Sequence, residues 1–365
     1  MKLNPQYRYP EKFKDQAIEF FNSYDLEKEV ACPDAKIAGL PDKTLRVCRF
    51  CGLKYPKVAF TKEAHIISEL LGNRFLVSDF ECDECNYKFG KYENDLAHHL
   101  GIARTVQSVK GKNNVPKFKS ADNTLKIENI QKQDEGNIVE IRRFDRFNQT
   151  FEFDKENSQT IVRYKKPPFT PLKVYKSLLK IALSCISKEH VNDYKSAFEY
   201  LRTNKYDETH KGFAIIYSYT MPLTFSFEKP VVMIFKKKNS NARLFTHVFT
   251  IFTLNIIYQL VIPFNKNDFH FYKNNGSVLT LWCPPLLGRD YTYPVETIRV
   301  STLDLSSTEK LENTYENLVI PMTKKTYEKS RFKDKVNGEI TEEDFDGNKI
   351  VGFDLLRIDD NTTDK

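Results

Sequence analysis

Four of the seven cysteines form two CxxC pairs, Cys48/Cys51 and Cys82/Cys85. Two such pairs supply four thiolates, which is the ligand set of a tetrahedral structural zinc ion. The odd number of cysteines in a long chain disfavours a disulfide framework and favours metal binding in a reducing compartment. We therefore expect Zn²⁺ at these four cysteines, with four reduced and buried thiols as the alternative.

The residues around and between the two pairs follow a distinctive order. Gly52 follows Cys51, Phe60–Asn73 reads FTKEAHIISELLGN, and Glu81–Ala97 reads ECDECNYKFGKYENDLA. This order resembles the HNH endonucleases, which have a ββα-metal fold, here with a treble-clef-like zinc knuckle. The resemblance covers about residues 45–105 and says nothing about the remainder of the chain.

The resemblance implies roles for two residues of this segment. His65 matches the strand histidine that acts as general base, since an imidazole with a pKa near neutral can take a proton from an attacking water. Asn86 matches the helix residue that ligates the catalytic ion, and an amide oxygen suits Mg²⁺ or Mn²⁺. The expected reaction is hydrolysis of a phosphodiester to a 5′-phosphate and a 3′-hydroxyl.

The segment also departs from the family pattern. Many members place Asp, Glu or His directly before the strand histidine as a metal ligand, whereas Ala64 stands here. Glu63 is one residue earlier, on the opposite side of a regular strand from Ala64, and can serve only where the strand bulges or turns. Glu93 shares a helix face with Asn86, but their Cα atoms are about 10 Å apart, so a water would have to bridge them. The polar position that orients the histidine falls near Ser78.

Basic residues in and beside this segment are candidates for phosphate contacts that do not read sequence. The alternative is a solvated surface, because several acidic residues dilute the patch. The candidates are Lys62, Arg74, Lys88, Lys91, Arg104, Lys110 and Lys112.

Periodicity and composition divide the chain into three regions and predict an α+β fold. Residues 1–43 form a polar lead-in with helical spacing over Glu11–Tyr24. Residues 44–105 hold the ββα-metal module. Residues 106–365 are expected to form a larger α+β domain rich in antiparallel strands. The expected role of this domain is recognition or regulation.

Within the third region, Thr170 and Pro171 predict an N-cap and the first position of a helical segment that runs to about Arg202. Short runs of β-branched and aromatic residues predict strands. These runs are Ile138–Ile141, Thr150–Phe153, Phe213–Tyr219, Leu223–Phe227, Val231–Phe235, Leu244–Phe264 and Val278–Trp282.

Composition narrows the class of protein further. A net charge of +7 permits a polyanionic partner without requiring one, and 28 Phe and 19 Tyr exclude a disordered or coiled-coil chain. Met1–Gln16 has no apolar signal segment, and Leu244–Phe264 contains polar residues that favour buried strands over a membrane helix. We expect a cytoplasmic protein without a membrane partner.

The sequence therefore predicts a metal-dependent HNH endonuclease, with DNA favoured over RNA because the family acts mostly on DNA. Family analogy also suggests phage defence or mobile-element biology and a homodimer. Two alternatives stay open. The module can be a zinc-stabilised nucleic-acid binding domain that has lost cleavage, or the C-terminal domain can be the functional centre, sensing a ligand or protein partner.

Overall fold

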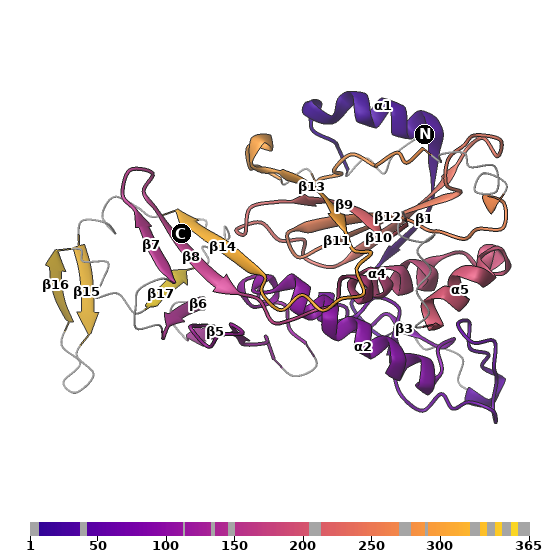
Figure 1. Cartoon of the computed structure of the whole chain (residues 1–365), viewed down its shortest axis with the longest axis horizontal. Coiled ribbons are helices and arrows are strands. Elements are labelled where there is room, and N and C mark those ends of the chain that lie inside the picture. Colours follow the sequence, from indigo (N-terminus) through magenta and orange to yellow (C-terminus); the bar gives the residue numbers. More distant parts are fainter. Residues whose placement is uncertain are drawn as a thin grey trace. The chain divides into compact units, whose positions relative to one another are not determined.

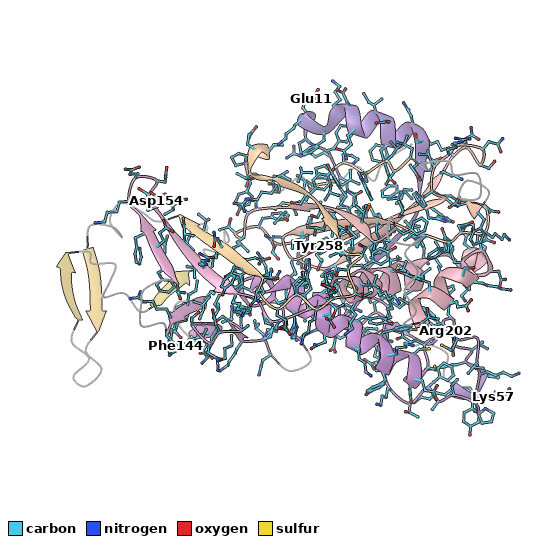
Figure 2. All side chains as sticks on the ribbon, viewed as in Figure 1. Glu11, Lys57, Phe144, Asp154, Arg202 and Tyr258 are labelled. Atoms are coloured by element: carbon cyan, nitrogen blue, oxygen red, sulfur yellow. The ribbon has the colours of Figure 1, made fainter. Side chains whose placement is uncertain are left out.

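A computed structural model gives the fold of the chain (Figures 1 and 2). Helices and antiparallel sheets occur together, which confirms the predicted α+β class. Lys112, a predicted phosphate contact, lies outside the described residues. The structure describes residues 7–36, 42–111, 114–132, 136–144, 150–203, 213–269, 279–288, 291–321, 329–333, 340–344 and 352–356.

The chain forms two compact units, each built from two separate stretches. The first unit is Met1–Asn114 with Phe169–Lys310, and the second is Val115–Pro168 with Leu311–Lys365. These units do not follow the boundaries predicted from the sequence, because residues 44–105 share a hydrophobic core with residues from 169 onward. Whether 44–105 also acts as a module of its own stays a prediction.

A six-stranded antiparallel sheet, in the order β1-β10-β11-β12-β9-β13, organises the first unit (Figure 1). Every residue of β11 is buried, and β11 continues through a tight turn into β12. The apolar stretch Leu244–Phe264 therefore forms strands, as predicted. The strands are β1 Tyr24–Ala31, β9 Ile215–Thr220, β10 Val231–Lys237, β11 His247–Thr253, β12 Ile256–Val261 and β13 Arg299–Asp304.

Helices cover both faces of this sheet (Figure 1). On one face, α1 (Lys14–Ser23), which confirms the helix predicted over Glu11–Tyr24, packs Phe20 against Phe235 of β10. On the other face lie α2 (Asp83–Leu100), α4 (Pro171–Cys185) and α5 (Lys195–Arg202). The module therefore packs within the core on that second face.

Helix α4 lies at the centre of that core. It begins as predicted, with Thr170 as N-cap and Pro171 in the first turn, and all its residues except Lys173 are buried. The helical segment predicted to run to about Arg202 is divided into three elements. The backbone is extended at Ile186, so α4 ends, and η4 (Lys188–Tyr194) and α5 follow as separate elements. The break allows a second apolar face to pack on the core.

The segment predicted as the module contains two short strands and a long helix. Strands β2 (Ala64–His65) and β3 (Val77–Ser78) pair antiparallel, with His65 opposite Val77, and α2 follows. This is the ββα order expected from the resemblance. The remaining short elements are η1 Glu11–Phe13, η2 Lys43–Leu45, η3 Glu69–Leu71, α3 Ala103–Val106 and η6 Val295–Thr297.

Three antiparallel sheets make up the described part of the second unit, in the orders β14-β8-β7, β17-β6-β5-β4 and β15-β16. The runs Ile138–Ile141 and Thr150–Phe153 fall on β6 and β7, as predicted. The strands are β4 Phe118–Lys119, β5 Leu125–Lys132, β6 Gly136–Arg143, β7 Phe151–Asp154, β8 Gln159–Lys165, β14 Tyr315–Pro321, β15 Lys329–Lys333, β16 Ile340–Asp344 and β17 Gly352–Leu356.

Two strand predictions are wrong. Leu223–Phe227 has no strand partner, and of the described part of Val278–Trp282 only Leu279 forms an isolated bridge, to Leu244. Aromatic side chains in both segments pack instead onto the second core of the sheet, so their apolar character reflects burial and not β-pairing. None of the described helices has the length and apolar character needed to cross a bilayer.

Candidate functional site

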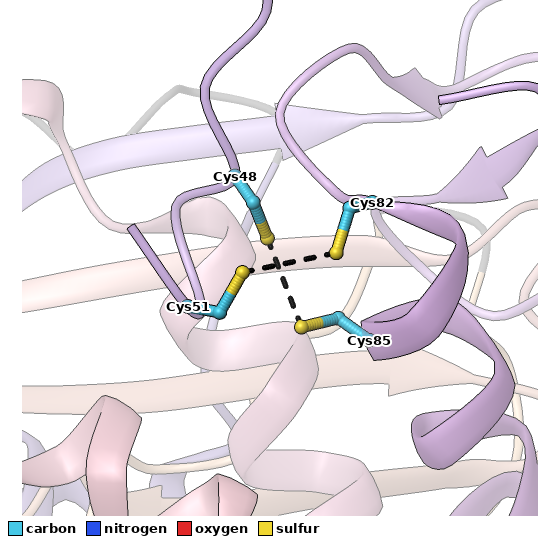
Figure 3. Close-up of side chains that lie close together, drawn as sticks. All are labelled: Cys48, Cys51, Cys82 and Cys85. Atoms are coloured by element: carbon cyan, nitrogen blue, oxygen red, sulfur yellow. Dashed lines mark hydrogen bonds between the residues drawn. The ribbon is translucent and has the colours of Figure 1, made fainter. Parts of the chain in front are cut away.

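The four predicted cysteines converge on one point (Figure 3). Their sulfur atoms all lie within 4.8 Å of one another, with Cys48 Sγ 3.7 Å from Cys85 Sγ and Cys51 Sγ 3.8 Å from Cys82 Sγ. A tetrahedron with zinc–sulfur bonds of about 2.3 Å has sulfur–sulfur edges of about 3.8 Å. The four thiols are therefore spaced for a zinc ion, and they are too far apart for disulfides.

Local backbone structure presents each pair. In the first pair, Gly52 adopts a φ of +72°, which turns the chain so that its N–H donates to the Cys48 carbonyl at 2.8 Å. In the second pair, Cys82 is the N-cap of α2 and Cys85 lies in its first turn. The Asp83 carboxylate accepts from the backbone N–H groups of Thr61 and Lys62, at 3.1 and 2.9 Å, which anchors α2 to the preceding loop.

Arg49 attaches the first cysteine pair to the C-terminal end of α4. Its Nη1 donates to the carbonyl of Ser184 at 2.8 Å, and to those of Leu183 and Ile186 at 3.3 Å. Carbonyls at a helix C-terminus lack intrahelical partners and carry partial negative charge, so a guanidinium is favourable there. The same guanidinium lies 3.8 Å from the ring centroid of Phe80. The CxxC knuckle is thereby fixed to the core of the first unit.

His65 ends β2 with its ring between an amide and two carboxylates. Its Nε2 lies 3.7 Å from Glu63 Oε1 and 4.0 Å from Glu69 Oε2, and its Nδ1 faces Asn73 Nδ2 at 3.5 Å. The His65 side chain is only 14% exposed. Burial lowers the pKa of the imidazole, and the charges of Glu69 and Glu63 oppose this. His65 is therefore mainly neutral near pH 7.

Asn73, not Ser78, is the polar residue that contacts the His65 ring. It is fully buried, and its Nδ2 donates to the carbonyls of Ile67 and Leu76 at 2.6 and 2.9 Å. Ser78 instead accepts from the N–H of Phe80 at 3.2 Å. The Gly72-Asn73 turn signal was visible in the sequence, but only the fold shows that Asn73 points inward.

A buried ion pair contacts the backbone of His65. Lys180 of α4 and Glu81 pair at 3.0 Å, with side chains 2% and 0% exposed, and Lys180 Nζ also donates to the His65 carbonyl. One ammonium thus connects α4, the His65 strand and the residue before Cys82. Burial raises the pKa of Glu81, and the Lys180 charge opposes this. Sequence reasoning missed the pair, because nothing local distinguishes these residues from surface ones.

The structure brings Glu63 and Asn86 to the same place as His65. Glu63 lies just before β2 begins, in non-strand backbone, so its carboxylate can turn to the His65 ring. Asn86, one turn into α2, places its Nδ2 3.4 Å from the Glu63 carbonyl. Glu93, further along α2, is near enough for its charge to act on the imidazole of His65. Glu69, on η3, is an additional carboxylate that the sequence reading did not single out.

The donor atoms around His65 suit a hard divalent ion. Carboxylates of Glu63 and Glu69 and the amide oxygen of Asn86 are oxygen ligands, which Mg²⁺ and Mn²⁺ prefer. Among the described residues, His65 is not in a group that brings three ligand atoms within 4.8 Å.

The predicted phosphate contacts fall into two sets. Lys88 and Arg104 already donate to carbonyls of Arg202 and Leu70, respectively, within the first unit. The other described candidates are exposed, and Lys91 lies with Nζ 4.8 Å from the ring centroid of Tyr87, which is 66% exposed. These exposed candidates are Lys62, Arg74, Lys91 and Lys110.

Residues 48–99 match the family model described as HNH endonuclease. The match includes both cysteine pairs, His65 and Asn86, and it identifies this segment as an HNH endonuclease domain, in agreement with the resemblance read from the sequence. It covers less than half of the chain, and the region after it has no family match. No curated protein and no solved structure matches the chain.

We expect Cys82→Ser to remove zinc from the four-cysteine site and to give unfolded or aggregated protein. A structural zinc ion contributes about 10 kcal/mol or more to the folding of small zinc domains. The measurements are thiolate-to-metal charge-transfer absorption of the Co²⁺-substituted protein and solubility after expression. Cys32→Ser, which changes a buried cysteine outside the cluster, should keep the absorption band. A folded Cys82→Ser protein with an unchanged band would contradict the zinc assignment.

Lys180→Met should lower the free energy of unfolding by about 3–5 kcal/mol, because it leaves the Glu81 carboxylate buried without a cation. The double variant Lys180→Met/Glu81→Leu should recover most of this loss, since no charge then remains buried. Urea denaturation of the full chain measures both. Lys173→Met on the same helix is the control, because its side chain is 45% exposed and its pair with Asp95 is worth about 0–1 kcal/mol. Equal stability of the single and double variants would exclude the proposed role of the pair.

Proposed function

We propose that this protein is a metal-dependent endonuclease that hydrolyses phosphodiester bonds in nucleic acid, DNA rather than RNA. The observation that carries the proposal is the position of His65. It lies on the β2–β3 ladder beside α2, next to the Glu63 and Glu69 carboxylates and close to Asn86, in the segment that matches HNH endonucleases.

His65 is the proposed general base. A neutral imidazole can accept the proton of the water that attacks phosphorus, and the lowered pKa of His65 keeps the ring neutral at physiological pH. Once protonated, the ring lies beside the negative charges of Glu63 and Glu69, which stabilise the imidazolium. Asn73 holds the loop that follows β2 and limits rotation of the ring.

Asn86, with Glu63 or Glu69, would hold the Mg²⁺ or Mn²⁺ ion, and Glu93 is a further candidate ligand. When bound, such an ion neutralises the negative charge that develops on the phosphate and on the leaving 3′ oxygen. Ala64, where many family members have a ligand, is buried opposite Ser78 and offers no donor. In this chain Glu63 takes over the position next to the base.

The proposed reaction needs only water and the phosphodiester. The water oxygen bonds to phosphorus while the bond between phosphorus and O3′ breaks. His65 keeps the water proton, and O3′ takes a proton from solvent. The products are a 5′-phosphate and a 3′-hydroxyl. We propose that exposed Lys62, Arg74, Lys91 and Lys110 contact neighbouring phosphates, and that the exposed Tyr87 ring offers a stacking surface for a base.

Two alternative functions would each give a different result in a cleavage assay. Nucleic-acid binding without metal-dependent cleavage would identify a zinc-stabilised binding protein, for which the buried Ala64 is the supporting observation. Cleavage that requires a small molecule or protein would assign a regulatory role to the region after residue 105. We propose that the role of this region is recognition of the substrate or regulation of the HNH segment. We also propose that cleavage of both strands requires a homodimer.

His65→Ala should reduce cleavage of plasmid DNA in Mg²⁺ or Mn²⁺ by about 10²–10⁴-fold, which is the usual contribution of a general base. The measurement is the rate of conversion from supercoiled to nicked plasmid, with binding followed in parallel by gel shift. His98→Ala on α2 is the matched control and should cleave normally. If wild type and His65→Ala bind DNA equally and neither nicks it with either metal, the endonuclease proposal fails.

Asn86→Ala should abolish metal-dependent cleavage and leave the melting temperature nearly unchanged. The side chain is partly exposed, and its hydrogen bond to the Glu63 carbonyl is long at 3.4 Å, so its loss should cost about 0.5 kcal/mol or less. Asn94→Ala, an exposed position on the same helix, is the control. Full activity of Asn86→Ala would remove this residue from the proposed metal site.

A further inference from the structure

A second group of metal-ligand side chains lies in the first unit, outside the HNH segment. Glu27 comes from β1, His190 from η4 and His247 from β11, and one ligand atom of each lies within 4.8 Å of the others. His190 Nε2 is 2.7 Å from Glu27 Oε1, and His247 Nε2 is 2.9 Å from Glu27 Oε2. Two imidazoles thus face the two oxygens of one carboxylate.

A β-bulge aims Glu27 into this position. The pairing of β1 with β10 skips one residue between Leu26 and Lys28, so Glu27 is the extra residue. Before the bulge, Tyr24 and Leu26 pack in the core on the α1 face, whereas Val30 after it packs on the α4 face. Bulges interrupt a ladder, and they occur often where a side chain must be redirected beside a functional site.

Each imidazole is held from its other nitrogen. His247 Nδ1 is 2.7 Å from the hydroxyl of Tyr194, and His190 Nδ1 is 3.4 Å from Asp193 Oδ2. Such outer partners fix the tautomer and the orientation of histidines that ligate metals. A neutral His190 that donates its Nδ1 proton to Asp193 can offer the lone pair of Nε2 to a metal ion.

One contact at the centre of the group lacks the geometry of a hydrogen bond. His247 is completely buried, and within the described part of the chain neither its Nε2 nor the Oε2 of Glu27 has a hydrogen-bond partner, despite their 2.9 Å separation. A lone pair of an imidazole facing a carboxylate oxygen is repulsive unless a proton or a cation lies between them. A metal ion between these two atoms would satisfy both of them, as a proton on His247 Nε2 would in the metal-free protein.

Two further charged groups adjoin His190. Lys236 Nζ is 3.2 Å from His190 Nε2, and Glu189 Oε1 is 3.3 Å from the same atom. Lys236 competes with a metal ion for Nε2 of His190, but Glu189 offsets the charge of Lys236, and the flexible Lys236 side chain can withdraw. An ion with ligand bonds of about 2.0–2.1 Å spaces its ligand atoms about 3.3 Å apart, so the Glu27 carboxylate would retreat by about half an ångström.

We propose that Glu27, His190 and His247 form a second metal site, which binds a first-row divalent ion of the zinc type. Two imidazoles and one carboxylate are ligands that zinc accepts readily, and they are too rich in nitrogen for Mg²⁺ or Ca²⁺. Asp193 and Tyr194 are the outer partners. The ion ties edge strand β1 and helix η4 to the central strand β11, so metal binding stabilises the first unit independently of the HNH site.

The test measures zinc bound to the purified full chain by elemental analysis after dialysis against a low concentration of Zn²⁺. We expect His190→Gln and Glu27→Gln to lose about one zinc ion per chain relative to wild type. Glu29→Gln is the matched control, because Glu29 is an exposed glutamate on the same strand. The Co²⁺–thiolate band of the four-cysteine site should persist in all three variants, which shows that each is folded.

A second measurement distinguishes metal binding from a metal-free network. Asp193→Asn should keep the fold and weaken zinc binding by about 10- to 100-fold, as loss of an outer partner does. Added Zn²⁺ should raise the melting temperature of wild type more than that of His190→Gln. If His190→Gln and Asp193→Asn bind as much zinc as wild type with the same affinity, the three residues form only a hydrogen-bonded network and the proposal is overturned.

Discussion

The spacing of four sulfur atoms at the corners of one tetrahedron is the constraint on which the HNH segment depends. The two cysteine pairs are separated by thirty residues that contain few regular elements. Strands β2 and β3 have only two residues each, and a ladder of that size has no stability of its own in water. A metal ion held by both cysteine pairs would join the first knuckle to the first turn of α2, close this loop and fix the geometry of its two ends.

Helix α4 provides the second half of the support. Its C-terminal carbonyls receive Arg49 from the first knuckle, and Lys180 in its middle holds both Glu81 and the His65 carbonyl. The Phe50 ring also packs against Phe89 and Phe198, which lie on α2 and α5. The segment that matches HNH endonucleases is thus part of a larger core, and the position of His65 relative to α2 depends on residues far along the chain.

The two clusters of candidate ligands in the first unit are positioned in different ways. Within each cysteine pair the two thiols are placed by a local turn or a helix N-terminus, so only the spacing inside a pair is a local property. Glu27, His190 and His247 come from three separate stretches and meet only because a bulge redirects one strand onto the face covered by η4. In both clusters the candidate ligands come from elements that are not adjacent in the sequence.

The sequence alone determined which four cysteines come together, the ββα order, the start of α4 at Thr170 and the buried strands of Leu244–Phe264. These features are encoded by short-range signals: fixed CxxC spacing, capping residues and runs of β-branched and aromatic side chains. The resemblance to HNH endonucleases singled out His65 and Asn86, whose proposed roles stay predictions.

Tertiary structure decided the rest. The sequence did not reveal that Asn73 faces the His65 ring, that Lys180 is buried against Glu81, or that α4 ends at Cys185. It also did not reveal that residues 44–105 share one core with residues 169–310. Each of these depends on contacts between residues far apart in the chain, and the free energy of such contacts arises only when packing has removed water and fixed the partners. The spacing of residues in the sequence indicates which of them are candidates for chemistry, whereas burial and long-range contacts determine which of them lie together in the fold.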